Sequence, residues 1–351
     1  MKNKLLIIAP YQFGELSDCY YWAKYATIEG WNVTYIGYKY KSREIKERSY
    51  PGVRVKSVMH YNNRLLLGVM FYLKCILEIL FFNHCNIVIC RMPMCQILPK
   101  LFYKRNVILD VRTLSVSKNL KIREEQDNAL IEQKKYFKKC SVISEGVGRK
   151  IGAPYTILPL GAEPLSVKPK CFEKMRLFYI GTFDNRNLSV FIEGLALFQK
   201  RSGCDVSFDI VGGGTAEEIL SIEKSIVDSG VSNVRMHGYL THDEAQKFFD
   251  ECNVGVCFVP VTDYYQYQPP TKLYEYLLSG MVCIATNTHS NKEVVNEKNG
   301  VIVYDTADGV CEGMYKLYEN AHKYSSKEIL CQSQSYQWSQ IVDNRLLKLF
   351  L

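Results

Sequence analysis

The sequence lacks the short motifs that mark several common chemistries. Its 13 cysteines form no Cys-x-x-Cys pair, and there is no Gly-x-Ser-x-Gly nucleophile elbow, no Walker phosphate loop and no Asp-x-Asp. The six histidines do not pair at metal-ligand spacing on one helix. A serine hydrolase, a P-loop enzyme and a metal site built on paired aspartates are therefore unsupported. An odd number of scattered cysteines favours reduced thiols in the cytosol over a disulfide framework.

Long apolar runs are also few. The longest, Leu65–Phe82, is interrupted by Lys74 and Glu78, whereas a transmembrane helix needs about 20 mostly apolar residues. We therefore predict no membrane-spanning helix. The run is expected to be a helix packed on a sheet or, alternatively, a helix lying in the plane of a membrane. Leu5–Ala9 is too short for the core of a signal peptide and is predicted to be a buried strand.

Charge is distributed unevenly along the 351 residues. The net charge is +8, but residues 1–160 hold 26 Lys and Arg against 12 Asp and Glu, and the remainder holds 18 against 24. A basic half indicates an anionic partner, for which phosphate groups, an anionic membrane surface and nucleic acid are the candidates. Because no nucleic-acid recognition motif accompanies the basic residues, we expect no nucleic-acid partner.

Short apolar runs alternate with helical patterns in both halves, which predicts βαβ units around parallel sheets. The predicted strands are Leu5–Ala9, Asn32–Gly37, Asn86–Cys90, Asn106–Asp110, Ser141–Ser144, Leu177–Ile180, Ser207–Val211, Asn233–Met236, Val254–Val259 and Val282–Ala285. Prolines cluster between Leu160 and Pro169, where we expect a domain boundary. Ligands of parallel sheets bind beyond the carboxyl ends of the strands, so the loops that follow the strands should hold the site.

The most informative stretch runs from Gln268 to Gly280. Proline favours the first turn of a helix, so we predict a helix that begins near Pro270 and Thr271 and ends at Gly280. The free amides and positive dipole of its N-terminus suit a diphosphate, and Lys272 adds a charge there. Glu275 lies on a similar face, where a carboxylate can accept hydrogen bonds from ribose hydroxyls. An ordinary surface helix with a solvated Lys/Glu pair is the alternative.

Two glycine-containing loops follow predicted strands in the second half. In Gly181–Asn187, Arg186 precedes a predicted helix and can bind phosphate through its guanidinium, although a solvated loop arginine is the alternative. Gly212–Gly214 is not a dinucleotide fingerprint, because the third glycine of that pattern would fall on Glu217. We interpret it as a tight turn near a ligand, which leaves a dinucleotide-dependent oxidoreductase as a minor alternative.

Several segments together resemble the family 4 (group 1) retaining glycosyltransferases, which have the GT-B fold. In chain order they are Cys140–Gly146, Ile157–Glu163, Phe178–Phe183, Asp209–Gly214, Asn233–Tyr239, Pro270–Tyr276, which matches the pattern P-x-K-x-x-E-Y, and Trp338. Each piece is short, but their order and spacing are specific. The resemblance implies two Rossmann-like α/β domains facing an interdomain cleft. The acceptor-binding domain would be residues 1–163, to which a helix over residues 335–351 crosses back, and the nucleotide-sugar-binding domain would be residues 164–334.

The resemblance also implies roles for individual residues. The catalytic groups would be Arg186 and Lys272, beside the diphosphate, and Glu275, beside the ribose. Other donor contacts would be Gly14, Gly181, Thr182, Gly213, His237, Gly238, Tyr239, Tyr267, Pro270, Thr271 and Leu273. Candidates on the acceptor side are Asp110, Arg112 and Ser144. We expect a UDP- or GDP-linked sugar as substrate, no metal and no cofactor.

The predicted function is transfer of a hexosyl or N-acetylhexosaminyl group to a lipid-linked or polysaccharide acceptor in cell-surface glycan biosynthesis. The protein is expected to be cytoplasmic and peripheral on the membrane, which its basic first domain would contact. Two departures from the family pattern leave an alternative open, a non-catalytic GT-B scaffold or partner subunit. Tyr267 stands where the family often has a first glutamate, and Thr182 stands where it has an arginine.

Overall fold

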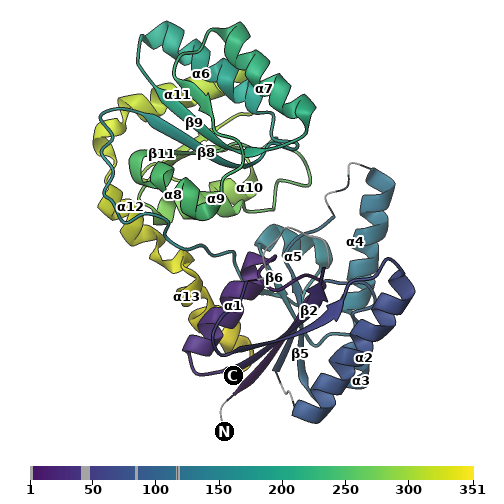
Figure 1. The fold of residues 1–351 in the computed structure, drawn as a ribbon. Coiled ribbons are helices and arrows are strands. Elements are labelled where there is room, and N and C mark those ends of the chain that lie inside the picture. The colour runs from purple at the N-terminus through teal and green to yellow at the C-terminus, as the bar shows by residue number, and fades with distance from the viewer. Residues whose placement is uncertain (1–2, 41–47, 84–85, 116, 118) are drawn as a thin grey trace. The chain divides into compact units, whose positions relative to one another are not determined.

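The computed structural model describes all of the chain except residues 1–2, 41–47, 84–85, 116 and 118 (Figure 1). The chain divides into two compact units. The first consists of Met1–Leu160 together with Trp338–Leu351, and the second of Gly161–Gln337. The sequence had placed these boundaries a few residues away, at residues 163 and 335. Each unit is built on one parallel sheet, which confirms the predicted α/β class with two Rossmann-like domains.

The first unit holds a seven-stranded sheet in the order β3-β2-β1-β4-β5-β6-β7. Its strands are β1 (Lys4–Ile8), β2 (Asn32–Lys39), β3 (Val53–Met59), β4 (Asn86–Cys90), β5 (Asn106–Val111), β6 (Lys139–Val142) and β7 (Thr156–Ile157). Central strands such as β1 and β4 are buried on both faces, which is why they appear in the sequence as unbroken apolar runs. The edge strand β3 was not predicted, because Arg54 and Lys56 interrupt its apolar residues and its side chains are mostly half-buried.

Five helices follow the strands of this unit. They are α1 (Ser17–Ile28), α2 (Arg64–Phe82), α3 (Ile97–Leu101), α4 (Leu120–Lys134) and α5 (Glu145–Ile151). The C-terminal segment was predicted to be a single helix. It is instead α13 (Trp338–Ile341) followed by a π-helical turn over Val342–Leu346 and a 3-10 turn over Leu347–Leu349. Trp338 is buried and stacks on Tyr21 of α1 with 5.6 Å between ring centroids, which holds this segment on the first unit.

Helix α2 is both more apolar and more exposed than expected. By length and composition it could cross a membrane, with a mean hydropathy of 2.2. Lys74 and Glu78 are therefore weaker evidence against a membrane-spanning helix than the sequence argument assumed. Only Leu67, Phe71, Cys75, Glu78 and Ile79 are buried. The ring of Phe71 lies 4.9 Å from that of Tyr38 in β2, and α2 also contacts β3. One face of α2 is therefore packed on the sheet, as the first of the two predictions stated, and the other face is exposed.

The second unit holds a six-stranded sheet in the order β10-β9-β8-β11-β12-β13. Its strands are β8 (Arg176–Thr182), β9 (Ser207–Gly213), β10 (Val234–Met236), β11 (Val254–Cys257), β12 (Val282–Thr286) and β13 (Gly300–Val303). Its helices are α6 (Leu188–Ser202), α7 (Ala216–Ser229), α8 (His242–Glu251), α9 (Thr271–Leu278), α10 (His289–Lys292), α11 (Ala307–Glu319) and α12 (Ser326–Ser333). The strand order reverses between β8 and β11, and ligands of such sheets bind at that point.

Strands β8 and β11 separate toward their carboxyl ends. They pair only at Leu177 with Val254 and at Phe178 with Gly255, whereas β8 pairs with β9 along its whole length. The hydroxyl of Tyr276, from α9, fills the gap: it accepts a hydrogen bond from the amide of Ile180 at 3.1 Å and donates to the carbonyl of Val256 at 3.5 Å. The reversal point is therefore held open by a helix α9 side chain.

Candidate active site

Lys272, in the first turn of α9, has its side chain in the gap between β8 and β11. Its Nζ is fully buried and has no hydrogen-bond partner in the described part of the chain. It lies 3.8 Å from the centroid of the Tyr179 ring on β8, a cation–π contact. A buried ammonium is normally paired with an acid or hydrogen-bonded. Lys272 has neither partner among the described residues, so its ammonium is suited to pair with an anionic ligand.

Burial has a direct electrostatic consequence for Lys272. The pKa of its ammonium is lowered from 10.5 to about 7, mainly because burial removes it from water; Arg186 adds to the lowering, and Cys257 and Glu275 oppose it. Glycine at position 181 makes room for the side chain, since a Cβ there would lie 2.8 Å from Nζ. Gly181 also has φ of +147°, which disfavours other residues. Near pH 7, Lys272 is therefore poised to gain a proton when an anion arrives.

Arg186 is the second cation of the site. Its guanidinium lies 4.8 Å from the ring centroid of Tyr265 and donates a hydrogen bond to the hydroxyl of that tyrosine at 2.5 Å. The loop that carries it is shaped by Asn185 and Asn187, both in the left-handed region with φ of 53° and 50°. The contact holds the arginine at the N-terminus of α6, as the sequence predicted.

Helices α6 and α9 begin without a side-chain cap. The side chains of their N-cap residues, Asn187 and Pro270, accept no hydrogen bond from the first turn within the described residues. The other α-helices of this unit are all capped by a serine or threonine; the caps are Thr215, Thr241, Thr288, Thr306 and Ser325. Free amides at a helix N-terminus carry partial positive charge and bind phosphate. Of the two uncapped helices, α6 follows directly after Arg186 and α9 contains Lys272.

Further unsatisfied groups lie in the loop between β11 and α9. Thr262 Oγ1 and Gln268 Nε2 are buried and, like Lys272 Nζ, have no hydrogen-bond partner among the residues that the structure describes. Buried polar atoms usually have partners, so Thr262, Gln268 and Lys272 bring three polar atoms that a bound ligand could pair with to the segment that ends in α9. Glu275 lies one turn further along α9, is half-buried, and is near enough to Lys272 to raise its pKa.

The predicted glycine turns meet at the same edge of the sheet. The Phe183 amide donates to the carbonyl of Gly213 at 2.8 Å, and the Gly212 amide donates to the carbonyl of Gly238 at 2.8 Å. No heavy atom lies within 4 Å of where a Cβ on Gly213 or Gly238 would stand, so these positions border open space. Backbone hydrogen bonds thus bring together the loops after β8, β9 and β10.

The other residues predicted to contact the donor differ in burial and in their contacts. His237 Nε2 lies 2.7 Å from Asp209 Oδ1, so the ring is held on β9, whereas Tyr239 is 83% exposed. The Tyr267 ring stacks on His289 at 5.2 Å. The carbonyl of Thr182 accepts a hydrogen bond from the Tyr179 hydroxyl at 2.7 Å. Of the first turn of α9, Pro270 and Thr271 are half-buried, whereas Leu273 is fully buried and belongs to the core.

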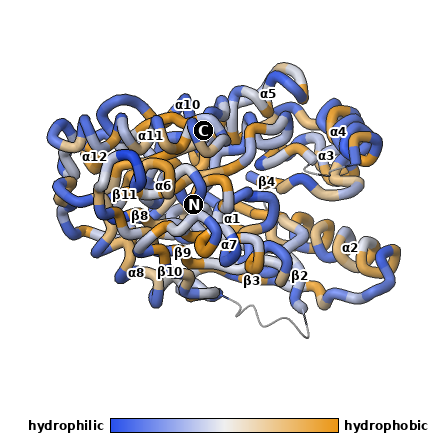
Figure 2. Tube along the Cα trace, turned by 90° about the horizontal axis from the view of Figure 1, so that it is seen from above, coloured by the Kyte–Doolittle hydropathy of each residue, from blue (hydrophilic) through white to orange (hydrophobic). Residues whose placement is uncertain are grey.

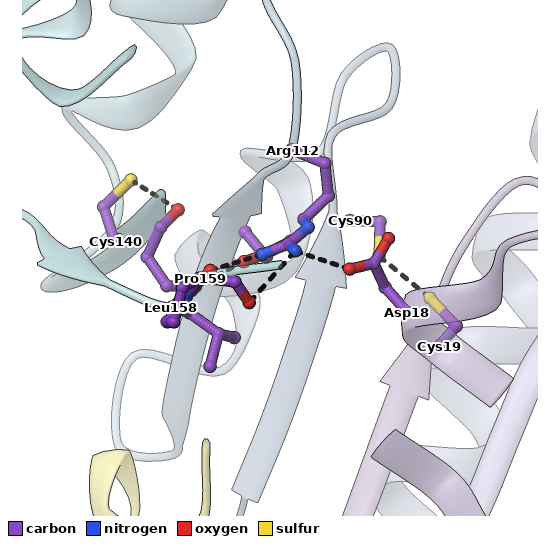
Figure 3. Close-up of polar contacts among 9 residues, drawn as sticks. Asp18, Cys19, Cys90, Arg112, Cys140, Leu158 and Pro159 are labelled. Carbon is purple, nitrogen blue, oxygen red and sulfur yellow. Dashed lines mark hydrogen bonds and ion pairs between the residues drawn. The ribbon is translucent and has the colours of Figure 1, made fainter. Parts of the chain in front are cut away.

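In the first unit, the guanidinium of Arg112 is hydrogen-bonded to groups of the protein itself (Figure 3). Its guanidinium donates to Asp18 at 2.5 Å, to the carbonyl of Leu158 at 2.6 Å and to that of Pro159 at 3.4 Å. Asp110 has no exposed surface; burial raises its pKa to about 6, which Arg112 and Ser141 partly oppose. Arg112 thus ties the end of β5 to α1 and to the residues after β7, and Asp110 ties β5 to Ser141 of β6.

Ser144 and Gly14 also have structural roles. Ser144 is buried and caps α5 by accepting a hydrogen bond from the amide of Val147. Gly14, with φ of +91°, packs against the side chain of Arg48, where a Cβ would come within 2.6 Å. A contact of Asp110, Arg112 or Ser144 with an acceptor, and of Gly14 with a donor, stays a prediction.

Sequence reasoning missed four residues of the site: Tyr179, Gly255, Tyr265 and Tyr276. A Cβ on Gly255 would lie 2.2 Å from the Tyr276 ring, so this glycine is what lets the tyrosine enter the gap. The signal available was a glycine inside an otherwise apolar strand, which often marks a close approach. No group of three His, Cys, Asp or Glu side chains within the described ranges is arranged to hold a metal ion.

Comparison with known proteins bears on this site and on the fold. Residues 174–320, which include Arg186, Lys272 and Glu275, match a family model described as glycosyl transferases group 1; this is less than half of the chain. A search of curated proteins gives no match.

Three solved structures illustrate the likeness of the whole chain. Sucrose-phosphate synthase from Thermosynechococcus elongatus is 15% identical, with 99% of this chain and 98% of that chain covered and a TM-score of 0.75. The lipopolysaccharide outer core galactosyltransferase WaaB is 12% identical, with 98% and 99% covered and a TM-score of 0.73. HepE from Anabaena, in complex with UDP and glucose, is 9% identical, with 99% of both chains covered and a TM-score of 0.74. Residues 174–320 thus match the group 1 glycosyltransferase model, and the chain as a whole has the two-domain GT-B fold of these solved structures.

Proposed function

We propose that this protein is a retaining, metal-independent glycosyltransferase of family 4. It would move a hexosyl or N-acetylhexosaminyl group from a UDP- or GDP-linked sugar to a lipid-linked or polysaccharide acceptor in cell-surface glycan biosynthesis. The observation that carries the proposal is Lys272, a buried ammonium without a hydrogen-bond partner in the described residues, at the reversal point of the second sheet. HepE was solved with UDP, which supports a uridine nucleotide as the first donor to test.

The chemistry follows from the charges of the reaction. When a glycosyl bond to a diphosphate breaks, positive charge develops on the sugar and negative charge on the departing phosphates. Lys272, Arg186 and the free amides at the starts of α6 and α9 would stabilise that negative charge. Tyr265 holds the guanidinium of Arg186 beforehand, so little reorganisation is needed during the reaction. Glu275, one turn behind Lys272, would accept hydrogen bonds from the ribose.

We place the acceptor in the first unit. A cavity of about 480 Å³ lies beyond the carboxyl ends of β1, β4 and β5, and Tyr11, Arg91, Met92, Pro93 and Leu114 are among its lining residues. Arg91 donates to the carbonyls of Thr113 and Gln126, so its charge is held at the wall of the cavity. A mostly apolar cavity with one fixed cation suits an acceptor that carries both a lipid and a phosphate. The protein would work on the cytoplasmic face of the membrane.

Transfer assays with matched variants test the proposal. The wild type should release UDP or GDP from a nucleotide sugar, and Lys272→Ala and Glu275→Ala should each lower kcat/KM at least a hundredfold. The controls are Glu223→Ala and Lys224→Ala, an acidic and a basic residue exposed on α7, which should leave the rate unchanged. Full activity of the Lys272 variant would reject the site.

A protein that binds UDP but never turns over any nucleotide sugar would instead be the non-catalytic scaffold. The departures at Tyr267 and Thr182 favour that second candidate. Isothermal titration with UDP, GDP and ADP identifies the nucleotide that either candidate binds, and the transfer assay separates the two, because only the enzyme consumes the sugar. Binding of NAD in preference to all three would point to the oxidoreductase.

A further inference from the structure

The side of α2 that faces away from the sheet carries only apolar side chains. These are Leu65, Leu66, Val69, Met70, Leu73, Leu77, Leu80 and Phe81, hereafter the apolar face of α2, and all are exposed, Leu73 to 53% and Phe81 to 77%. At 100° per residue they cover roughly 160° of the helix circumference. A surface helix normally places polar residues there. The apolar residues are visible along α2 in Figure 2.

Cations gather at the C-terminal end of this helix, around Phe82. The guanidinium of Arg54 lies 4.3 Å from the centroid of the Phe82 ring and the ammonium of Lys56 lies 5.8 Å from it. Lys4 donates a hydrogen bond to the carbonyl of Phe82 at 2.8 Å. Arg54 is also paired with the buried Glu78 at 2.6 Å, so Lys4 and Lys56 are the cations better placed to meet another anion.

We infer that the apolar face of α2 lies in the plane of an anionic phospholipid bilayer, with Lys4 and Lys56 against the lipid phosphates. Apolar side chains of an interfacial helix enter the boundary between head groups and acyl chains, and flanking lysines add electrostatic attraction. The basic balance of residues 1–160, with 26 Lys and Arg against 12 Asp and Glu, acts in the same direction. Tyr72 of α2 donates to the carbonyl of Pro93, which lines the acceptor cavity, so the bound lipid surface would lie beside that cavity.

Two other occupants fit the observations less well. To span the membrane, α2 would have to leave the sheet, expose Phe71 and Ile79, and separate Glu78 from Arg54. A second copy of the chain would bring two equally basic surfaces together, since a symmetric contact pairs like patches. A bilayer takes the apolar face without unfolding and supplies the opposite charge.

Vesicle flotation with matched variants tests the apolar part of the inference. The full chain should bind vesicles of phosphatidylcholine with 30 mol% phosphatidylglycerol at 50 mM salt. Leu73→Glu with Leu77→Glu should weaken binding at least tenfold. The control is Leu220→Glu with Val227→Glu, which adds the same charge to exposed apolar positions of α7 (63% and 78% exposed) and should weaken binding far less. Circular dichroism melts confirm that each variant is folded.

The cationic part has its own comparison. Lys4→Gln with Lys56→Gln should weaken binding about fivefold per lysine, and the loss should shrink at 500 mM salt. Lys200→Gln with Lys224→Gln removes the same charge from exposed positions of the second unit and is the control. Equal binding of the two double variants would overturn the role of Lys4 and Lys56.

Three outcomes would overturn the docking itself. The first is unchanged vesicle binding of the Leu73/Leu77 variant. The second is retention of the wild type on vesicles after an alkaline carbonate wash, which would indicate a spanning helix. The third is a wild-type dimer in light scattering that the Leu73/Leu77 variant converts to a monomer. None of these depends on glycosyl transfer, so the inference can fail while the proposed function holds, and the reverse.

Discussion

The charge state of Lys272 is the property of this site that is most open to measurement. Its pKa of about 7 in the folded protein lies below the 10.5 of an unperturbed lysine because its ammonium is buried. Between these values the unfolded chain holds one more proton than the folded chain, so stability rises with pH across that window. The lowering of the pKa corresponds to about 5 kcal/mol of unfolding free energy, at 1.36 kcal/mol per pKa unit. Below pH 7 the folded protein is destabilised by this amount, and the destabilisation disappears as the pH rises toward 10.5.

Lys272→Met removes the charge and keeps the length of the side chain. We expect this variant to be more stable than the wild type at pH 6, and the gap should narrow by about 1.4 kcal/mol per pH unit from pH 7 upward. Urea unfolding from pH 6 to 9 measures the gap. A gap that is absent, or constant over that range, would refute the claim that the folded protein holds this lysine as an unpaired buried cation.

The same proton controls ligand binding. Binding a diphosphate restores the charge of Lys272, so affinity should fall tenfold per pH unit above 7, or about 50-fold between pH 7 and pH 9. The last ionisation of a phosphate lies near pH 6, outside this window. Titration calorimetry with UDP in buffers of different ionisation enthalpy should show proton uptake by the wild type and none by Lys272→Met. Equal pH dependence in both proteins would contradict the assignment.

Three further changes follow from contacts described above. Arg186→Lys keeps the charge but loses the planar donor fork, so UDP should bind about tenfold more weakly in calorimetry, while Lys224→Arg, a matched exchange on α7, should have no effect. Gly255→Ala would put a Cβ 2.2 Å from the Tyr276 ring, so thermal unfolding should show a loss of about 1–3 kcal/mol; an unchanged melting temperature would contradict the fitted gap. Arg112→Ala would leave the half-buried Asp18 carboxylate and two carbonyls without their guanidinium donor, which should cost about 3–5 kcal/mol in urea unfolding. A neutral effect would show that Arg112 is not a structural anchor.

The sequence was informative where burial dominates. Strands such as β1, β4 and β12 are buried on both faces, so an unbroken apolar run predicts them correctly. It failed for β3, where Arg54 and Lys56 lie on an edge strand, and for residues 335–351, where helical spacing does not distinguish one helix from a series of short turns.

The site was predictable in part for a related reason. Lys272 and Arg186 could be proposed from the sequence because both lie at the start of a helix, Lys272 within α9 and Arg186 just before α6, positions that chain order alone indicates. Tyr265 and Tyr276 could not be found, because their roles depend on contacts with residues far away in sequence, Arg186 and Ile180. The two charges of α2 exclude less than the sequence argument assumed, because Glu78 is buried, is paired with Arg54 and does not interrupt the exposed face.

The two sheets differ at their reversal points, and this difference agrees with the proposal that the second unit binds the donor. In both sheets the first strand lies between two others, β1 between β2 and β4, and β8 between β9 and β11. Beside β1 and β4, the fold supplies the partners of its own cation, since Arg112 is bound by Asp18 and by two carbonyls. Between β8 and β11, Lys272 Nζ has no hydrogen-bond partner among the described residues and lies against Gly181. A diphosphate would compete with the fold's own carboxylate in the first unit and would complete the site in the second.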